Sequence, residues 1–268
     1  MIKITLPDGS VKEFASGVTP MEVAKSISEG FARNVISASF NGTTVETTTP
    51  LTTDGSLILY TWNDEDGKKA FWHSTSHVMA QVLEQMYPGI KLTLGPAIAN
   101  GFYYDVDFEE HKITEADFKK IEDRVLEISR GKHEFKLRPV SKADALELYK
   151  DNVYKTEMIT NLEDGTITFC DHDTFTDLCR GGHIPNTGII KAMKIMSVAG
   201  AYWRGDEKNK QLTRVYGTSF PKQKDLTEYL ALLEEAKRRD HRKLGKELEL
   251  FAFSQKVGQG LPLWLPKG

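Results

Sequence analysis

Two histidines four residues apart, His73 and His77, have the residue types and the spacing that could do chemistry. The apolar run around them continues to Met86 and predicts an amphipathic helix, on which both imidazoles leave the same face. Such a pair can hold a metal ion or share the binding and transfer of a proton, whereas two partly buried structural histidines are the alternative. Ser74 stands where the zinc-protease motif requires a glutamate, so that class of enzyme is excluded.

A cysteine and a histidine with the same spacing, Cys179 and His183, enclose Gly181 and Gly182. The two glycines favour a flexible turn rather than a helix. Together with the helical pair, these residues make a set of three histidines and one cysteine that could satisfy tetrahedral zinc. A buried cysteine beside a loop histidine is the alternative interpretation.

The composition bounds the class of protein. A chain of 268 residues has room for about two domains, and 40% hydrophobic with 27% charged residues is ordinary for a soluble globular protein. The formal net charge of −3 carries no global nucleic-acid signature, so any RNA contact must come from local basic patches. Two cysteines favour a reducing compartment, and neither a signal peptide nor a membrane span is expected. We therefore expect a cytoplasmic protein.

The elements that must position these residues fall into a small part and a larger one. Residues 1–62 combine a predicted hairpin, a helix that begins at Pro20 and further strands, which is typical of a β-grasp fold, with a generic α+β module as the alternative. Residues 63–224 mix helices and strands without regular alternation, which favours an α+β domain. A long helix is predicted from Asp225, and its basic end at 237–243 is either a solvated face or an RNA contact.

A series of short motifs runs in order through the chain. They are HSTSH at 73–77, NGFYYDVD at 100–107, Tyr154-Lys155, DLCRGGHIPN at 177–186, GAYWRGD at 200–206 and RRDHRKLG at 238–245. In this order, and over essentially the whole chain, they resemble the N-terminal half of bacterial threonyl-tRNA synthetases. The resemblance implies a TGS domain at 1–62, an editing domain shared with alanyl-tRNA synthetases at 63–224, a linker helix at 225–243 and the start of a class II catalytic domain at 244–268.

The function that this resemblance implies is the hydrolysis of tRNA(Thr) wrongly charged with serine. Serine lacks one methyl group of threonine, which is worth only about 1–3 kcal/mol in a binding pocket, so a second pocket too tight for threonine is needed. The expected partners are the 3′ end and acceptor stem of tRNA(Thr), with no membrane. No cofactor is expected in this stretch. The full-length protein would be a homodimer that attaches threonine with ATP and holds one Zn²⁺ in its catalytic domain.

The resemblance also implies roles for individual side chains. His73 would position or deprotonate water, and Lys155 would stabilise negative charge or donate a proton. The substrate-binding set would be His77, Tyr104, Asp177, Cys179 and His183, with Asp177 meeting the seryl amino group and Tyr104 the substrate or terminal adenosine. We expect no metal; zinc, if present, would be held by His73, His77, Cys179 and His183, which leaves no open position for water.

Several alternatives stay open at this level. Taken alone, Lys155 is more typical of a surface lysine, and Tyr104 of a core residue. Gly182 departs from the family, where proline is more common, and is expected to loosen the turn. The chain could instead be a zinc-dependent hydrolase of small molecules. It could also be a non-catalytic RNA-binding regulatory module, because its N-terminal part resembles domains of stringent-response proteins and some GTPases.

Overall fold

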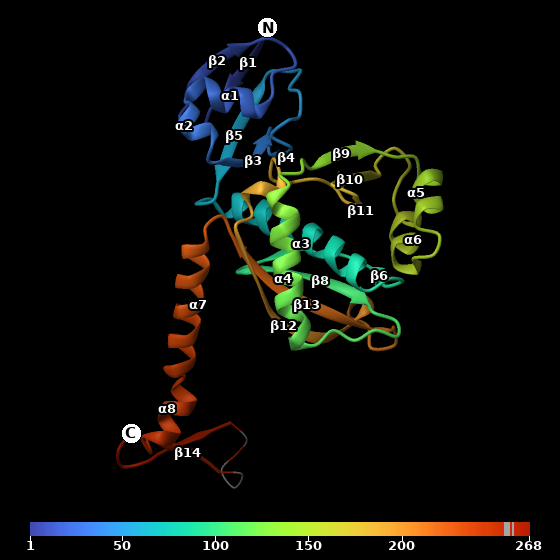
Figure 1. Ribbon diagram of the computed structural model, residues 1–268. Helices are drawn as coiled ribbons and strands as arrows, with labels where there is room; N and C mark the ends of the chain where they lie inside the picture. The colour runs from blue at the N-terminus through green and yellow to red at the C-terminus, as the bar shows by residue number, and fades with distance from the viewer. Residues whose placement is uncertain (255–257, 259) are drawn as a thin grey trace. The chain divides into compact units, whose positions relative to one another are not determined.

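A five-stranded sheet in the order β2-β1-β5-β3-β4 forms the N-terminal part of the protein (Figure 1). The computed structural model describes residues 1–254, 258 and 260–268. The elements of this part are β1 Ile2–Thr5, β2 Val11–Phe14, α1 Pro20–Ile27, α2 Glu29–Ala32, β3 Val35–Phe40, β4 Thr43–Val45 and β5 Gly55–Thr61. Strand β1 pairs antiparallel with β2 and parallel with β5, which confirms the predicted β-grasp fold.

Local sequence explains where the first helix begins. The Thr19 side chain accepts a hydrogen bond from the backbone N–H of Glu22 (3.2 Å), and the Glu22 carboxylate accepts one from the backbone N–H of Thr19 (2.8 Å). This reciprocal cap satisfies two backbone donors that the first turn would otherwise leave unpaired. The predicted start at Pro20 is therefore confirmed.

The larger part is built on a second sheet, in the order β12-β13-β8-β6, with β7 paired to β8. Its strands are β6 Lys91–Leu92, β7 Ala97–Ile98, β8 Gly101–Asp107, β12 Ala192–Tyr202 and β13 Gln211–Phe220. Helices α3 (Glu65–Met86) and α4 (Glu115–Arg130) pack on this sheet and on each other (Figure 1). The mixture of helices and antiparallel strands confirms the predicted α+β class.

The helix that carries the two histidines is buried nearly all round, and the prediction of an amphipathic helix was wrong in this respect. Every residue from Ser74 to Leu83 is buried. Its polar residues are tolerated because their hydroxyl groups bond back to the helix: Ser74 donates to the carbonyl of Ala70 (2.7 Å) and Thr75 to that of Phe71 (2.9 Å). A serine or threonine therefore need not mark a solvent face.

A small antiparallel sheet and two short helices complete this part. They are β9 Lys136–Pro139, α5 Lys142–Leu148, α6 Val153–Thr160, β10 Thr168–His172 and β11 Phe175–Leu178, with single 3₁₀ turns at η1 Thr187–Ile189 and η2 Trp203–Gly205. Asn152 caps α6, because its Oδ1 accepts hydrogen bonds from the backbone N–H groups of Tyr154 and Lys155, each at 3.1 Å. The cap places Lys155 in the first turn of the helix.

Residues from Lys222 onward form a separate compact unit. It contains α7 Gln223–Arg238, α8 His241–Glu247, β14 Phe251–Phe253 and β15 Pro262–Trp264. The basic helix end is partly neutralised within the unit, since Arg238 and Arg239 pair with Glu235, and Arg242 pairs with Asp240. In the part of the chain that the structure describes, no helix is long and apolar enough to cross a bilayer.

Candidate active site

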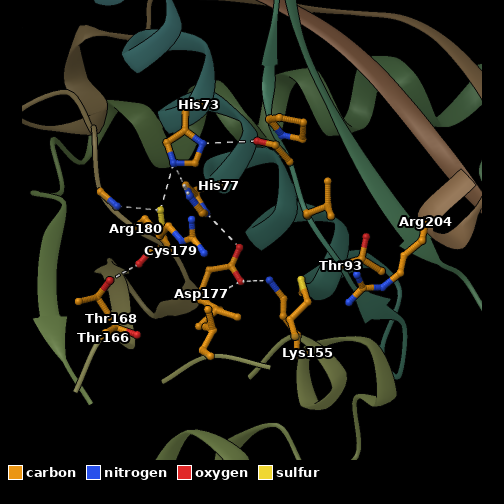
Figure 2. Close-up of a pocket in the computed structure, with 17 residues that line it drawn as sticks. His73, His77, Thr93, Lys155, Thr166, Thr168, Asp177, Cys179, Arg180 and Arg204 are labelled. Carbon is orange, nitrogen blue, oxygen red and sulfur yellow. Dashed lines mark hydrogen bonds and ion pairs between the residues drawn. The ribbon is translucent and has the colours of Figure 1, made fainter. Parts of the chain in front are cut away.

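The four residues of the two Cys/His motifs converge in the structure. His73 and His77 leave one face of α3, and Cys179 approaches them from the segment that follows β11 (Figure 2). His183 lies four residues further along the same turn. The Sγ atom of Cys179 lies 3.1 Å from Nε2 of His73 and 3.2 Å from Nε2 of His183. The Nε2 atoms of His73 and His77 are 3.3 Å apart. The helical spacing thus brings both imidazoles to the same thiol.

The turn itself depends on its two glycines. Gly181 and Gly182 have φ angles of +99° and +89°, in the left-handed region that side chains with a Cβ avoid. A proline at position 182 would hold φ near about −65° and would lack an N–H. The N–H of Gly182 instead donates to the carboxylate of Glu46 (3.0 Å), a hydrogen bond that proline could not make. The expectation that this glycine loosens the turn stays a prediction.

A buried carboxylate organises the other side of the site. Asp177 in β11 accepts hydrogen bonds from Nζ of Lys155 (2.6 Å), the hydroxyl of Tyr104 (2.7 Å) and Nδ1 of His77 (3.0 Å). Burial opposes the charged form, but the charges of Lys155 and His77 outweigh it and hold the pKa of Asp177 well below its usual range. Four elements, α3, β8, α6 and β11, are therefore joined through one ionised side chain.

Both Lys155 and Tyr104 are buried beside Asp177, although the sequence context of the lysine alone did not favour burial. Lys155 is only 1% exposed, so it is not a surface lysine. Tyr104 is fully buried and its hydroxyl donates to Asp177 behind the cavity wall. Tyr104 is therefore placed to hold Asp177, and its predicted contact with substrate or adenosine stays a prediction.

The charges of the cluster differ from one imidazole to the next. Burial lowers the pKa of His73 and so keeps this ring neutral. Burial also opposes charge on His77 and His183. Cys179 and Asp177 nevertheless raise the pKa of His77, and Cys170, Cys179 and Glu46 raise that of His183. Burial would likewise raise the pKa of Cys179, but the charge of His77 and the hydrogen bonds with His183 and His73 bring it well below its usual value. His73 is thus a neutral base among charged neighbours.

The cluster opens into a cavity of about 490 Å³. Of the four Cys/His residues, His73 is the least buried, and it lines the cavity together with His77, Cys179, Lys155 and Asp177. His183 is fully buried behind them. Other side chains line the same cavity but were not predicted from the sequence, among them Thr93, Thr168, Arg180 and Arg204 (Figure 2).

Cys179 lines the cavity, but its sulfur is enclosed by neighbouring groups. Its sulfur is approached by a ring nitrogen of His73 and of His183 and, at 3.4 Å, by the backbone N–H of Gly181. Only 8% of the residue is exposed. Because three neighbours surround the sulfur, it has little access to an incoming carbonyl carbon.

The four Cys/His residues fit a zinc ion by geometry and chemistry. Their ligand atoms all lie within 4.8 Å of one another, and the contacts of 3.1–3.3 Å approach the edges of a tetrahedron with zinc bonds of about 2.0–2.3 Å. His77 and His183 each turn their other ring nitrogen to a carboxylate, Asp177 and Glu46, as zinc-binding histidines do. Such an ion would have four protein ligands and would serve to hold the cluster together.

Glu46 is the residue of this cluster that sequence reasoning missed. It follows β4 in the N-terminal part and lies 137 positions from His183 in the sequence, yet its Oε1 is 2.9 Å from Nδ1 of that histidine. No motif or periodicity in residues 43–50 marks it as a site residue. Only the packing of one part of the chain on the other brings the two together.

Comparison with known proteins adds a family context. Residues 2–61 match the TGS domain, and residues 166–216 match the threonyl and alanyl tRNA synthetase second additional domain. Over all 268 residues the chain is 90% identical to the threonine–tRNA ligase of Flavobacterium johnsoniae and 87% identical to that of Flavobacterium psychrophilum. It is 58% identical over 270 aligned positions to that of Cytophaga hutchinsonii. The chain spans 41–42% of the length of these relatives.

Proposed function

Because this chain corresponds over its whole length to the N-terminal region of threonine–tRNA ligases, and carries their TGS and second additional domains, we propose that it hydrolyses seryl-tRNA(Thr). The observation that carries the proposal is His73, a base kept neutral by its lowered pKa, which faces a cavity beside the buried Lys155–Asp177 pair. For a full-length protein like the Flavobacterium johnsoniae relative, 41% of which the chain covers, we propose threonine attachment with ATP, a catalytic-domain zinc and a homodimer.

The reaction is the attack of water on the ester carbonyl carbon at the 3′ end of the tRNA. His73 accepts one proton of the water as the new carbon–oxygen bond forms. The Nζ of Lys155 stabilises the negative charge that develops on the carbonyl oxygen. The ester bond to the ribose then breaks, and the proton held by the imidazole passes to the ribose oxygen. The products are free serine and an uncharged tRNA 3′ end.

Asp177 is the anionic partner for the seryl ammonium group. Among the described residues that line the cavity, it is the only carboxylate. Its Oδ1 already accepts a hydrogen bond from Lys155 (2.6 Å), so an incoming ammonium group would share or replace that contact. Replacement would release the lysine toward the carbonyl oxygen, where its charge is needed. Binding of the seryl ammonium group would then also free Lys155 to stabilise the charge on the carbonyl oxygen.

Selection against threonine comes from the space around the seryl side chain. Threonine carries one more methyl group, and forcing an extra methyl into a closely packed site costs about 1–3 kcal/mol. Serine, which lacks this methyl group, fits the same site without strain. The pocket rejects threonine by its size. It thereby complements the site that attaches the amino acid, which cannot reject serine because serine is smaller than threonine.

The proposal is tested by release of amino acid from tRNA(Thr) charged with either serine or threonine, with the 268-residue chain in excess. We expect rapid release of serine and a threonine ester that decays at its uncatalysed rate. Hydrolysis of neither ester would refute the proposal and favour a binding module. Equal hydrolysis of both would refute the size sieve.

Removal of metal is a separate prediction. We expect the rate of serine release to be unchanged after dialysis against a strong chelator, because the proposed reaction uses His73 and Lys155 and needs no metal ion. Metal analysis of the same samples before and after dialysis is the control. A loss of activity that added zinc restores would contradict the prediction.

A further inference from the structure

One acidic side chain of the β-grasp domain makes its hydrogen bonds with the larger domain. The carboxylate of Glu46 accepts from the backbone N–H of Gly182 (3.0 Å), the backbone N–H of His183 (3.2 Å) and Nδ1 of His183 (2.9 Å). Glu46 is 9% exposed. A carboxylate removed from water in this way is costly unless such donors satisfy it, so the two partners are held to one relative position.

These contacts help to orient His183, whose Nδ1 also lies 3.6 Å from Sγ of Cys170. With Nδ1 turned to Glu46, the opposite nitrogen, Nε2, faces the sulfur of Cys179 at 3.2 Å. The ring is stacked on Phe135, with an interplanar angle of 7°, and on His73, with an angle of 21°. A rotation of His183 would therefore disturb both the thiol and the ring that we assign as the base.

The two domains also meet at His73 itself. A cavity of about 360 Å³ is lined by Ser37, Thr44 and Tyr60 of the β-grasp domain, and by His73, Gly181 and Gly182 of the larger one. The β-grasp domain thus contributes a wall beside the base as well as the carboxylate behind His183.

We propose that the β-grasp domain contributes to hydrolysis at the site in the larger domain. Its Glu46 is a positioning residue that holds His183 and the backbone of the turn at residues 181–183. This inference rests on the proposed function for its catalytic readout. It assigns the N-terminal domain a role in the chemistry of the neighbouring domain, which requires no contact of its own with tRNA.

The test compares Glu46→Gln with Glu13→Gln, a control at an exposed glutamate on β2 of the same domain. Glutamine keeps the size of the side chain, but its amide NH₂ cannot accept a hydrogen bond from the turn or from His183. We expect Glu46→Gln to lower kcat for serine release about tenfold, with KM within about twofold, as is usual for residues that orient a functional histidine. An unchanged kcat, or a change confined to KM, would overturn the inference.

A double variant distinguishes positioning through His183 from a general loss of structure. If Glu46 acts through the ring of this histidine, Glu46→Gln lowers kcat less in a His183→Ala background than in the unmodified chain, because His183→Ala has already removed the contact at Nδ1 and leaves only the backbone contacts of Glu46. Multiplicative effects would overturn the inference. Thermal unfolding of all four proteins of the cycle shows whether each remains folded at the assay temperature.

A spectroscopic measurement separates this inference from the proposed function. Nitrogen-15 NMR of the histidine rings should show a proton on Nδ1 of His183, slow to exchange with solvent in the unmodified chain and lost or shifted in Glu46→Gln. The signal does not depend on catalysis. If the unmodified chain releases no serine, the proposed function fails while this spectrum still decides the role of Glu46. An identical His183 signal in both proteins would overturn that role.

Discussion

Replacing His73 with alanine is expected to lower the rate of serine release from seryl-tRNA(Thr) by about 10²- to 10⁴-fold, the usual range for loss of a general base. Burial lowers the pKa of this ring, so it is neutral and able to accept a proton at physiological pH. It is also the member of the Cys/His cluster with the best access to the cavity. Single-turnover deacylation with enzyme in excess measures the chemical step directly.

The same variant separates an esterase from a binding module. Affinity for uncharged tRNA(Thr), measured in parallel, should stay within about twofold, since a base contributes to the transition state rather than to ground-state binding. His111→Ala is the matched control, because that histidine is exposed and its ring contacts the carbonyl of Pro88 and the ring of Tyr87, away from the cavity. If His73→Ala kept more than about a tenth of the rate, the base would have to be another group.

The second large effect is on stability. Lys155→Met should lower the free energy of unfolding by about 3–5 kcal/mol at pH 7, because it leaves the carboxylate of Asp177 buried without its lysine partner. Both side chains are nearly inaccessible, at 2% and 3% exposure, so water cannot replace the lost contact. Denaturant unfolding of the variant and the unmodified chain measures the difference.

Two further variants show whether the loss of stability comes from the unpaired charge of Asp177. In Lys150→Met the lost partner is Glu147, and both side chains of that pair are exposed, so the cost should be at most about 1 kcal/mol. In the double variant Lys155→Met/Asp177→Asn no charge is left without its partner, so part of the stability should return. A loss below about 1 kcal/mol for Lys155→Met alone would show that His77 and Tyr104 suffice to hold Asp177.

Local features of this protein were readable from the sequence because their causes are local. A capping threonine before Pro20 starts a helix, and two histidines four apart must leave the same helix face. Two adjacent glycines before His183 make a turn. Each of these inferences depends on residues within one or two helical turns of each other, where backbone geometry alone decides the outcome.

Tertiary structure decided the environment of the same residues. The sequence could not tell that Lys155 is buried, that Tyr104 lies behind Asp177 rather than in the cavity, or that Glu46 reaches His183 across 137 positions. Burial and charge pairing depend on which distant segments pack together. Protonation of His73 and Cys179 follows from that packing and from no pattern along the chain, because the free energy of a charge is determined by everything around it.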